Sequence, residues 1–234
     1  MPPVSGSISA SLSASLADAL ALLLPVDCAG CGVADEALCD GCRGSLVPAP
    51  TRRLLDDEVR VHSALAFEGV PARVIRGLKE DGRTGLAVPL GLALRAAVRA
   101  AGVAGEAVLV PVPSSRPALR RRGFAVTPLL ARRTGLPVIP LLAPARTVAD
   151  QRGLDRDARA RNVAGSLRVR ARHTARVGDR PIVVVDDVLT TGATLVEATR
   201  TLRAAGLPVA AAATVAATPR RSSETRSGSD LRHA

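Results

Sequence analysis

The run at residues 182–195, IVVVDDVLTTGATL, constrains the fold of this chain more than any other segment. Its first four residues are apolar on both faces, which is typical of a central strand in a parallel sheet covered by helices. Two acids follow at the carboxyl end of that strand, and a turn of small residues then opens a helical pattern. Open α/β sheets bind ligands at this edge. We therefore expect an α/β fold with a binding site at the end of the strand.

The turn after this strand has the composition of an anion site. Small residues let backbone N–H groups approach a ligand closely, the helix N-terminus adds favourable partial charge, and threonines add hydroxyl donors. A monophosphate suits such a turn, and the neighbouring carboxylates of Asp186 and Asp187 suit the two hydroxyls of a ribose. The turn residues predicted to bind phosphate are Thr190, Thr191, Gly192, Ala193 and Thr194.

Strand and helix patterns alternate between residues 61 and 215. Short apolar runs predict strands at 62–67, 107–112, 137–142, 165–169, 182–186 and 208–215. Helical patterns lie between them at 71–78, 86–101, 118–133 and 193–205. This alternation implies right-handed crossovers and a mostly parallel sheet flanked by helices. Since the chain has only two aromatic residues, Phe67 and Phe124, its core must be aliphatic.

Composition divides the chain into four parts. Residues 1–25 are rich in Ser, Ala and Leu and predict an amphipathic helix over 12–24. Residues 26–60 form a Cys-dense block and a linker, 61–217 the α/β domain, and 218–234 a polar tail expected to be disordered. The N-terminal apolar stretch is too short to span a bilayer and follows no basic residue, so we favour a helix over a secretory signal and expect no stable membrane insertion.

The four cysteines follow the spacing Cys28-x2-Cys31-x7-Cys39-x2-Cys42. Two such pairs can supply four thiolates to a tetrahedral zinc ion, which fills every coordination position and is typical of a structural site. A redox disulfide pair and an iron–sulfur cluster are the alternatives. No other cysteine occurs, as expected for a protein of the reducing cytoplasm.

The 182–195 run resembles the phosphoribosyl-pyrophosphate motif of type I phosphoribosyltransferases, which has four apolar residues, two acids, two apolar residues and a Thr/Gly turn. The resemblance implies that Asp186 and Asp187 hold the ribose hydroxyls, that residues 190–194 cradle the 5-phosphate of phosphoribosyl pyrophosphate, and that Mg²⁺ accompanies the pyrophosphate. Purine-salvage members carry an acid where this chain has Thr190, so the resemblance disfavours a purine-salvage reaction.

Two further segments fit the same resemblance. In this superfamily the loop after the first core strand grips pyrophosphate, a role that falls here on Ser114, Ser115 and Arg116; the alternative is a Pro-rich turn before an exposed basic helix. The polar stretch 145–163 resembles the catalytic loop of glutamine-using amidophosphoribosyltransferases, which implies catalytic roles for Arg146, Gln151 and Arg152; the alternative is a solvated charged hairpin.

The order of the Cys block, the segment GLKEDGR and the two acids resembles the ComF family of competence-type proteins, which join a zinc module to a phosphoribosyltransferase-like domain. That segment holds the only lysine, Lys79, which we expect to contact phosphoribosyl pyrophosphate. Two main functions stay open: a Mg²⁺-dependent phosphoribosyltransferase of unidentified acceptor, or a non-enzymatic protein of single-stranded DNA uptake that contacts the DNA or the competence machinery. A phosphoribosyl pyrophosphate sensor is a third. The net charge of +11 suits any polyanion, whereas two phenylalanines are few for stacking on single strands.

Overall fold

The computed structural model describes residues 26–103, 107–145 and 163–219. The expected N-terminal helix, all of the 218–234 tail except Thr218 and Pro219, and most of the 145–163 stretch lie outside these ranges. Among the helices of the described ranges, none has the length and apolar character needed to cross a bilayer.

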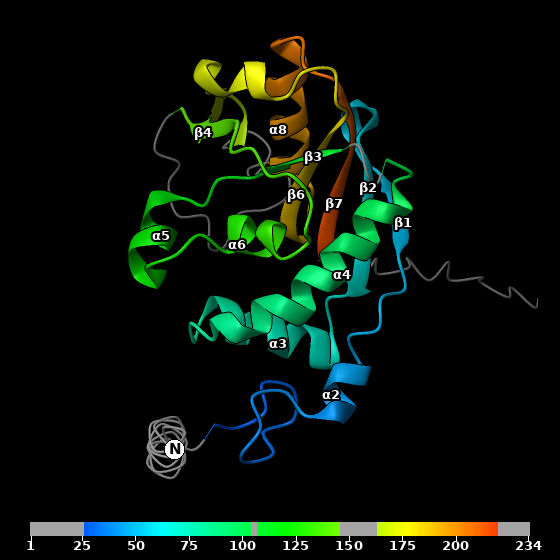
Figure 1. Ribbon diagram of the computed structural model, residues 1–234, viewed down its shortest axis with the longest axis vertical. Helices are drawn as coiled ribbons and strands as arrows, with labels where there is room; N and C mark the ends of the chain where they lie inside the picture. Colours follow the sequence, from blue (N-terminus) through cyan, green and yellow to red (C-terminus); the bar gives the residue numbers. More distant parts are fainter. Residues whose placement is uncertain (1–25, 104–106, 146–162, 220–234) are drawn as a thin grey trace, which may run out of the picture.

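A five-stranded sheet forms the centre of the molecule (Figure 1). Its order is β1-β2-β7-β6-β3, and every neighbouring pair is parallel except β1 and β2. The strands are β1 (Thr51–Leu54), β2 (Arg60–Ala66), β3 (Val108–Pro111), β6 (Ile182–Leu189) and β7 (Val209–Ala217). The predicted α/β fold with a mostly parallel, helix-flanked sheet is confirmed.

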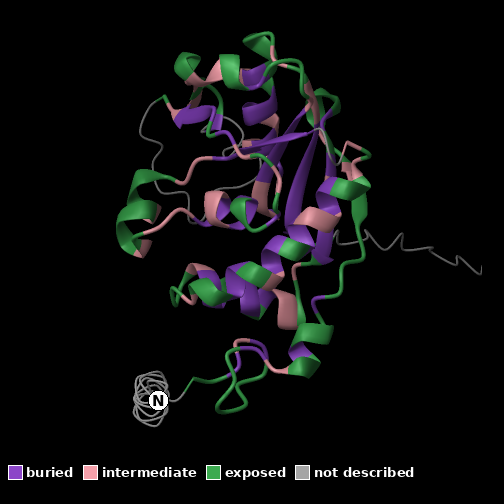
Figure 2. Ribbon diagram, viewed as in Figure 1, coloured by how far each residue is buried: buried purple, intermediate pink, exposed green. Residues whose placement is uncertain are grey.

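Helices cover both faces of the sheet. The larger core cluster joins helix α3 (Gly69–Lys79), helix α4 (Ala87–Ala100) and helix α6 (Val126–Arg132) to one face, which includes Val183 and Val185. The second cluster joins helix α8 (Ala193–Ala204) to the other face, which includes Ile182 and Val184. Alternate residues of β6 thus enter two different cores, because successive strand side chains point to opposite faces. This double burial explains the apolar run before Asp186 (Figure 2).

The expected linker contributes a strand and a short helix. Strand β1 pairs antiparallel with β2 at the edge of the sheet, and a 3₁₀ turn, η1 (Asp56–Glu58), follows it. Before β1, helix α2 (Asp40–Gly44) belongs to the Cys block. The other 3₁₀ turns are η2 (Thr84–Leu86) and η3 (Ala171–Arg176).

Two of the predicted elements are wrong in part. The expected helix over 118–133 is two helices, α5 (Arg116–Arg122) and α6, because Gly123 adopts a left-handed conformation with φ of 76° that ends α5. Within the expected strand over 137–142, Val138 makes an isolated bridge with Leu109, and Leu142 alone belongs to a strand, in a second sheet. Prolines at 137 and 140 lack the N–H groups that a longer ladder requires.

A second, two-stranded sheet lies beside α8. Strand β4 (Leu142–Pro144) pairs antiparallel with β5 (Leu167–Val169). These strands flank the 146–162 segment, and the backbone N–H of Ala145 donates to the carbonyl of Ser166 at 2.7 Å. The two ends of that segment are therefore held together where they join the described part of the chain.

Candidate phosphoribosyl site

The two acids of the signature run lie side by side on β6. Strand β6 continues through them to Leu189, so they are inside the strand rather than after it. The Asp186 carboxylate accepts hydrogen bonds from the backbone N–H of Asp187 at 2.8 Å and from the Thr127 hydroxyl at 3.2 Å. The Asp187 carboxylate forms an ion pair with the Lys79 ammonium at 2.9 Å.

Burial, and next to it the charge of neighbouring Asp187, raise the pKa of Asp186 to about 7. The backbone N–H of Asp187, the Lys79 ammonium and the Thr127 hydroxyl act in the opposite direction but do not compensate. Of the two adjacent carboxylates only that of Asp187 has an ion pair among the described residues, and the second negative charge beside it is unfavourable. The pair is therefore short of hydrogen-bond donors and positive charge, which a ligand with hydroxyls or a divalent cation would supply.

The expected phosphate turn leads directly into α8. Gly192 caps this helix in a left-handed conformation with φ of 86°, and a Cβ atom added there would collide with the Leu55 side chain. The left-handed backbone favours glycine at this position, and any other residue would in addition displace the Leu55 side chain. The first N–H groups of a helix have no partner within it. The N–H of Ala193 donates to the Thr191 hydroxyl at a long 3.5 Å, and the N–H groups that follow can donate to an anion.

The pyrophosphate-loop candidates lie at the start of helix α5. Ser115 caps α5, since its hydroxyl accepts from the backbone N–H of Ala118 at 3.3 Å, and Pro117 stands in the first turn. The same short helix carries Arg122, whose buried Nε atom has no hydrogen-bond partner among the described residues. A buried guanidinium nitrogen without an acceptor is costly, and an anion in the site would supply one.

These pieces surround one cavity of about 390 Å³. The acids at 186 and 187 lie on one side of it, with Thr127 and Thr194. The turn after β3 and the ends of the 146–162 segment form the other walls. The full lining is Val112, Pro113, Ser114, Ser115, Arg116, Pro117, Ala118, Arg122, Thr127, Pro144, Ala145, Val163, Ser166, Leu167, Asp186, Asp187 and Thr194.

The structure thus brings together segments that are far apart in the sequence. Of the predicted phosphate turn, Thr194 lines this cavity, while Thr191 and Ala193 line a second cavity of about 180 Å³ on the Leu55 side of the turn. Lys79 reaches the site through Asp187 from the end of α3. Arg146, Gln151 and Arg152 lie outside the described residues. Arg122 lines the cavity although we did not predict it as a site residue. Its position in the last turn of the helix that starts beside Ser115 could have indicated this role.

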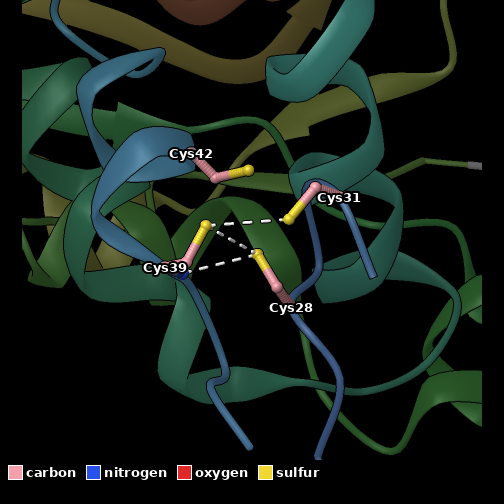
Figure 3. A group of neighbouring side chains, drawn as sticks. All are labelled: Cys28, Cys31, Cys39 and Cys42. Carbon is pink, nitrogen blue, oxygen red and sulfur yellow. Dashed lines mark hydrogen bonds between the residues drawn. The ribbon is translucent and has the colours of Figure 1, made fainter. Parts of the chain in front are cut away.

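The four cysteines converge at the N-terminal end of the described chain (Figure 3). Their sulfur atoms all lie within 4.8 Å of one another, with Cys39 Sγ 3.6 Å from Cys28 Sγ and 3.7 Å from Cys31 Sγ. Four thiolates about 2.3 Å from a tetrahedral zinc ion are separated by about 3.8 Å. The residues present therefore fit a closed metal site of four thiolates, such as one for zinc.

The electrostatics of the cysteines agree with this chemistry. Burial opposes ionisation of Cys28, but hydrogen bonds from the backbone N–H groups of Cys39, Cys31 and Gly30 outweigh it and lower the pKa of Cys28 to about 6. Burial and the neighbouring thiols raise the pKa of Cys42 to about 12. Four ionised thiols this close repel one another strongly, and a divalent cation removes that repulsion.

The Cys block packs on α3, the helix that ends at Lys79. The Arg73 guanidinium donates to the Gly30 carbonyl, and Arg83 donates to the carbonyl of Ala37 at 3.0 Å. Cys28 and Cys42 belong to the same buried cluster as the α3 residues Val74 and Leu78. The metal-site candidate is therefore continuous with the main core.

Comparison with known proteins agrees with this reading of the fold. The family model described as the phosphoribosyl transferase domain matches residues 118–230, from α5 past β7. A solved structure of orotate phosphoribosyltransferase from Aeropyrum pernix is 21% identical, with 75% of this chain and 77% of that chain covered, at a TM-score of 0.33. No curated protein matches. Residues 118–230 of this chain are therefore similar to the phosphoribosyl transferase domain.

Proposed function

We propose that the protein binds 5-phosphoribosyl 1-pyrophosphate with Mg²⁺ in the 390 Å³ cavity and transfers its phosphoribosyl group to an acceptor. One observation carries the proposal: the acid pair, the start of α8 and the turn at Ser114–Arg116 line a single cavity. A ribose diol, a monophosphate and a diphosphate are the three groups that such partners suit, and this ligand contains all three.

The acid pair is proposed to hold the ribose. Hydroxyls at the ribose 2 and 3 positions would donate to the carboxylates of Asp186 and Asp187, which now share few donors. The 5-phosphate would lie on residues 190–194 at the helix N-terminus. Lys79 sits 2.9 Å from the Asp187 carboxylate and would contribute its charge to the bound ligand.

The opposite wall is proposed to hold the diphosphate. The backbone of Ser114 and Ser115 and the guanidinium of Arg116 line the cavity there, and we add Arg122 because its Nε lacks an acceptor among the described residues. Guanidinium groups bind phosphate oxygens in a charge-assisted geometry. When bound, Mg²⁺ would neutralise the diphosphate, with carboxylate oxygens of the acid pair as its protein ligands.

Arg146, Gln151 and Arg152 complete the proposal. Ala145 and Val163, at the two ends of the 146–162 segment, both line the cavity, so the segment departs from its rim. Cations there would stabilise the charge that develops on departing pyrophosphate.

The acceptor is proposed to be small or held without aromatic stacking. Phe67 lies under the Arg76 guanidinium, 5.5 Å from ring centroid to carbon, and Phe124 packs against the main core. Because these are the only aromatic residues, the chain offers no ring to sandwich a base. The acceptor would instead meet small apolar residues, among them Pro117, Ala118 and Pro144.

Titration calorimetry with phosphoribosyl pyrophosphate and Mg²⁺ tests binding, and release of pyrophosphate in the presence of ammonia, glutamine or a panel of bases tests transfer. We expect saturable one-to-one binding that ribose 5-phosphate weakens by competition. The proposal would be refuted if phosphoribosyl pyrophosphate and ribose 5-phosphate both gave no heat of binding and did not compete with each other. Binding without turnover would identify a sensor of the ligand instead.

A role in handling single-stranded DNA, as in ComF-type proteins, is the second candidate. One observation favours it: Arg168, Arg170 and Arg172 line a common hollow beside β5, and none of the ion pairs found among the described residues involves them. Such a cluster suits a phosphate backbone, and binding should weaken steeply as salt rises. Single-stranded DNA affinity that is lost in Arg168→Ala/Arg170→Ala, with phosphoribosyl pyrophosphate affinity unchanged, would support it.

We further propose that the Cys block binds structural zinc and that the protein works in the cytoplasm, where four close thiols remain reduced. The proposed units are the N-terminal segment 1–25, the zinc module and linker 26–60, the phosphoribosyltransferase-like domain 61–217 and the tail 218–234. Metal analysis of protein purified without chelators should find one zinc ion per chain.

A further inference from the structure

Glu197 is a buried carboxylate that none of the proposed binding roles uses. Its side chain is 5% exposed, although it lies on α8, one turn after the helix starts. Acidic residues are almost never buried to this degree unless they are paired. Its partners therefore indicate what the residue does.

The carboxylate holds a backbone turn from a distant part of the chain. The N–H of Gly165 donates to Glu197 Oε1 at 2.9 Å. Gly165 has φ of 68° and lies inside a tight turn in which the N–H of Ser166 donates to the carbonyl of Val163 at 3.0 Å. A single side-chain acceptor thus connects helix α8 with the segment that precedes β5.

The charge on Glu197 is balanced on its own helix. The Arg200 guanidinium donates to both carboxylate oxygens, with Nε 2.8 Å from Oε2 and Nη2 3.0 Å from Oε1. The Thr201 hydroxyl donates to Oε1 at 3.3 Å. A two-point Arg–carboxylate contact fixes the carboxylate plane, and in this orientation Oε1 faces the N–H of Gly165.

The anchored turn is a wall of the cavity. Val163, Ser166 and Leu167 line it, and the carbonyl of Ser166 accepts from Ala145, which lines it too. The same helix α8 that carries Glu197 begins at the phosphate turn. One rigid element therefore carries both the 5-phosphate donors and the anchor of the wall at residues 163–167.

We propose that Glu197 is a positioning residue, which sets the wall at residues 163–167 relative to the phosphate turn and so fixes the width of the sugar-phosphate cavity. The ligand part of this inference rests on the proposed function. The anchoring of the Gly165 turn does not, so the two can be tested separately.

Hydrogen exchange of the full-length protein without ligand tests the anchor. In Glu197→Ala we expect the Gly165 amide to exchange roughly tenfold faster, as for loss of one buried hydrogen bond, and Glu197→Gln to restore much of the protection because its amide oxygen can accept the same bond. Ala198→Gly is the matched control, since it weakens the same helix and its side chain makes none of these contacts. Unchanged exchange in Glu197→Ala, or equal acceleration in Ala198→Gly, would overturn the anchor.

Calorimetry with phosphoribosyl pyrophosphate and Mg²⁺ tests the consequence. We expect Kd to rise roughly three- to tenfold in Glu197→Ala, to recover in Glu197→Gln, and to stay unchanged in Ala198→Gly, in proportion to the exchange results. If Glu197→Ala does not fold, Glu197→Asp withdraws the carboxylate by one methylene and serves the same comparison. Faster exchange with an unchanged Kd would overturn the positioning role. Failure of the unmutated protein to bind the ligand would instead refute the proposed function and leave the exchange result to decide the anchor.

Discussion

Replacing Asp186 by Asn should make the protein more stable at pH 8 while weakening its ligand site. Asn is nearly isosteric, and its side-chain oxygen can still accept from the Asp187 N–H and the Thr127 hydroxyl. What it removes is the negative charge beside Asp187. The prediction therefore isolates the electrostatic cost of the pair from its packing.

The magnitude follows from the pKa of Asp186, which rises from its usual 3.8 to about 7. The raised pKa means that the folded protein binds this proton more tightly than the unfolded chain does. Stability is therefore unaffected below about pH 4, decreases as the pH rises from about 4 to 7, and carries the full cost above about pH 7. At about 1.4 kcal/mol for each pH unit, that cost reaches about 4 kcal/mol.

Urea denaturation at pH 5, 6, 7 and 8 measures this directly. The gain of Asp186→Asn over the unmutated protein should be about 1–2 kcal/mol at pH 5 and grow to at most about 4 kcal/mol at pH 8. Asp81→Asn, an exposed acid, is the control and should show no such growth. Parallel stability profiles for Asp186→Asn and the unmutated protein between pH 5 and 8 would refute the assignment of a strained acid pair. The same variant should bind phosphoribosyl pyrophosphate at least tenfold more weakly.

Three further changes probe the rest of the site. Asp187→Ala should abolish detectable phosphoribosyl pyrophosphate binding by calorimetry, because it removes the carboxylate that pairs with Lys79, while metal analysis should find the zinc content unchanged. Cys31→Ser or chelation should expose residues 26–44 to limited proteolysis before the main domain unfolds; simultaneous loss of both would contradict a separate module. Gly192→Ala should cost about 1 kcal/mol or more in urea denaturation, because alanine is strained at φ of 86° and its methyl group meets Leu55; a neutral effect would show that the turn is more adaptable than the structure indicates.

The Lys79–Asp187 ion pair connects the two halves of the molecule. Lys79 ends α3, on which the Cys block packs, and its partner belongs to the acid pair in the sheet. Both side chains are mostly buried, at 26% and 15% exposure. Removal of one partner costs more stability in such a pair than in a surface ion pair. The pair also involves the only lysine of the chain, and an arginine would not make the same compact contact.

Several features were predictable from sequence because they depend on neighbouring residues. The apolar run of β6, the acids within it and the Thr/Gly turn before α8 are all read from one continuous stretch. The Cys spacing likewise predicts the convergence of four thiols, because each Cys-x2-Cys pair is a local turn. The helices at 69–79, 87–100 and 193–204 follow from their apolar periodicity.

Other features could not be read in this way. Two of them had a local signal that our prediction gave too little weight beside the apolar periodicity. Gly123 marks the break between α5 and α6, and two prolines flank the isolated bridge at Val138. The place of Arg122 on the cavity also had one local signal, its position in the last turn of α5. The pairing of Lys79 with Asp187 and the hydrogen bond between Glu197 and Gly165 had no local signal. The sequence alone determined the acids, the Thr/Gly turn and the cysteine pairs, because each depends on the backbone conformation and the alternation of buried residues over a short stretch. Only the tertiary structure decided which charges meet, because a contact between residues 32 or 108 positions apart depends on how the sheet and its helices pack.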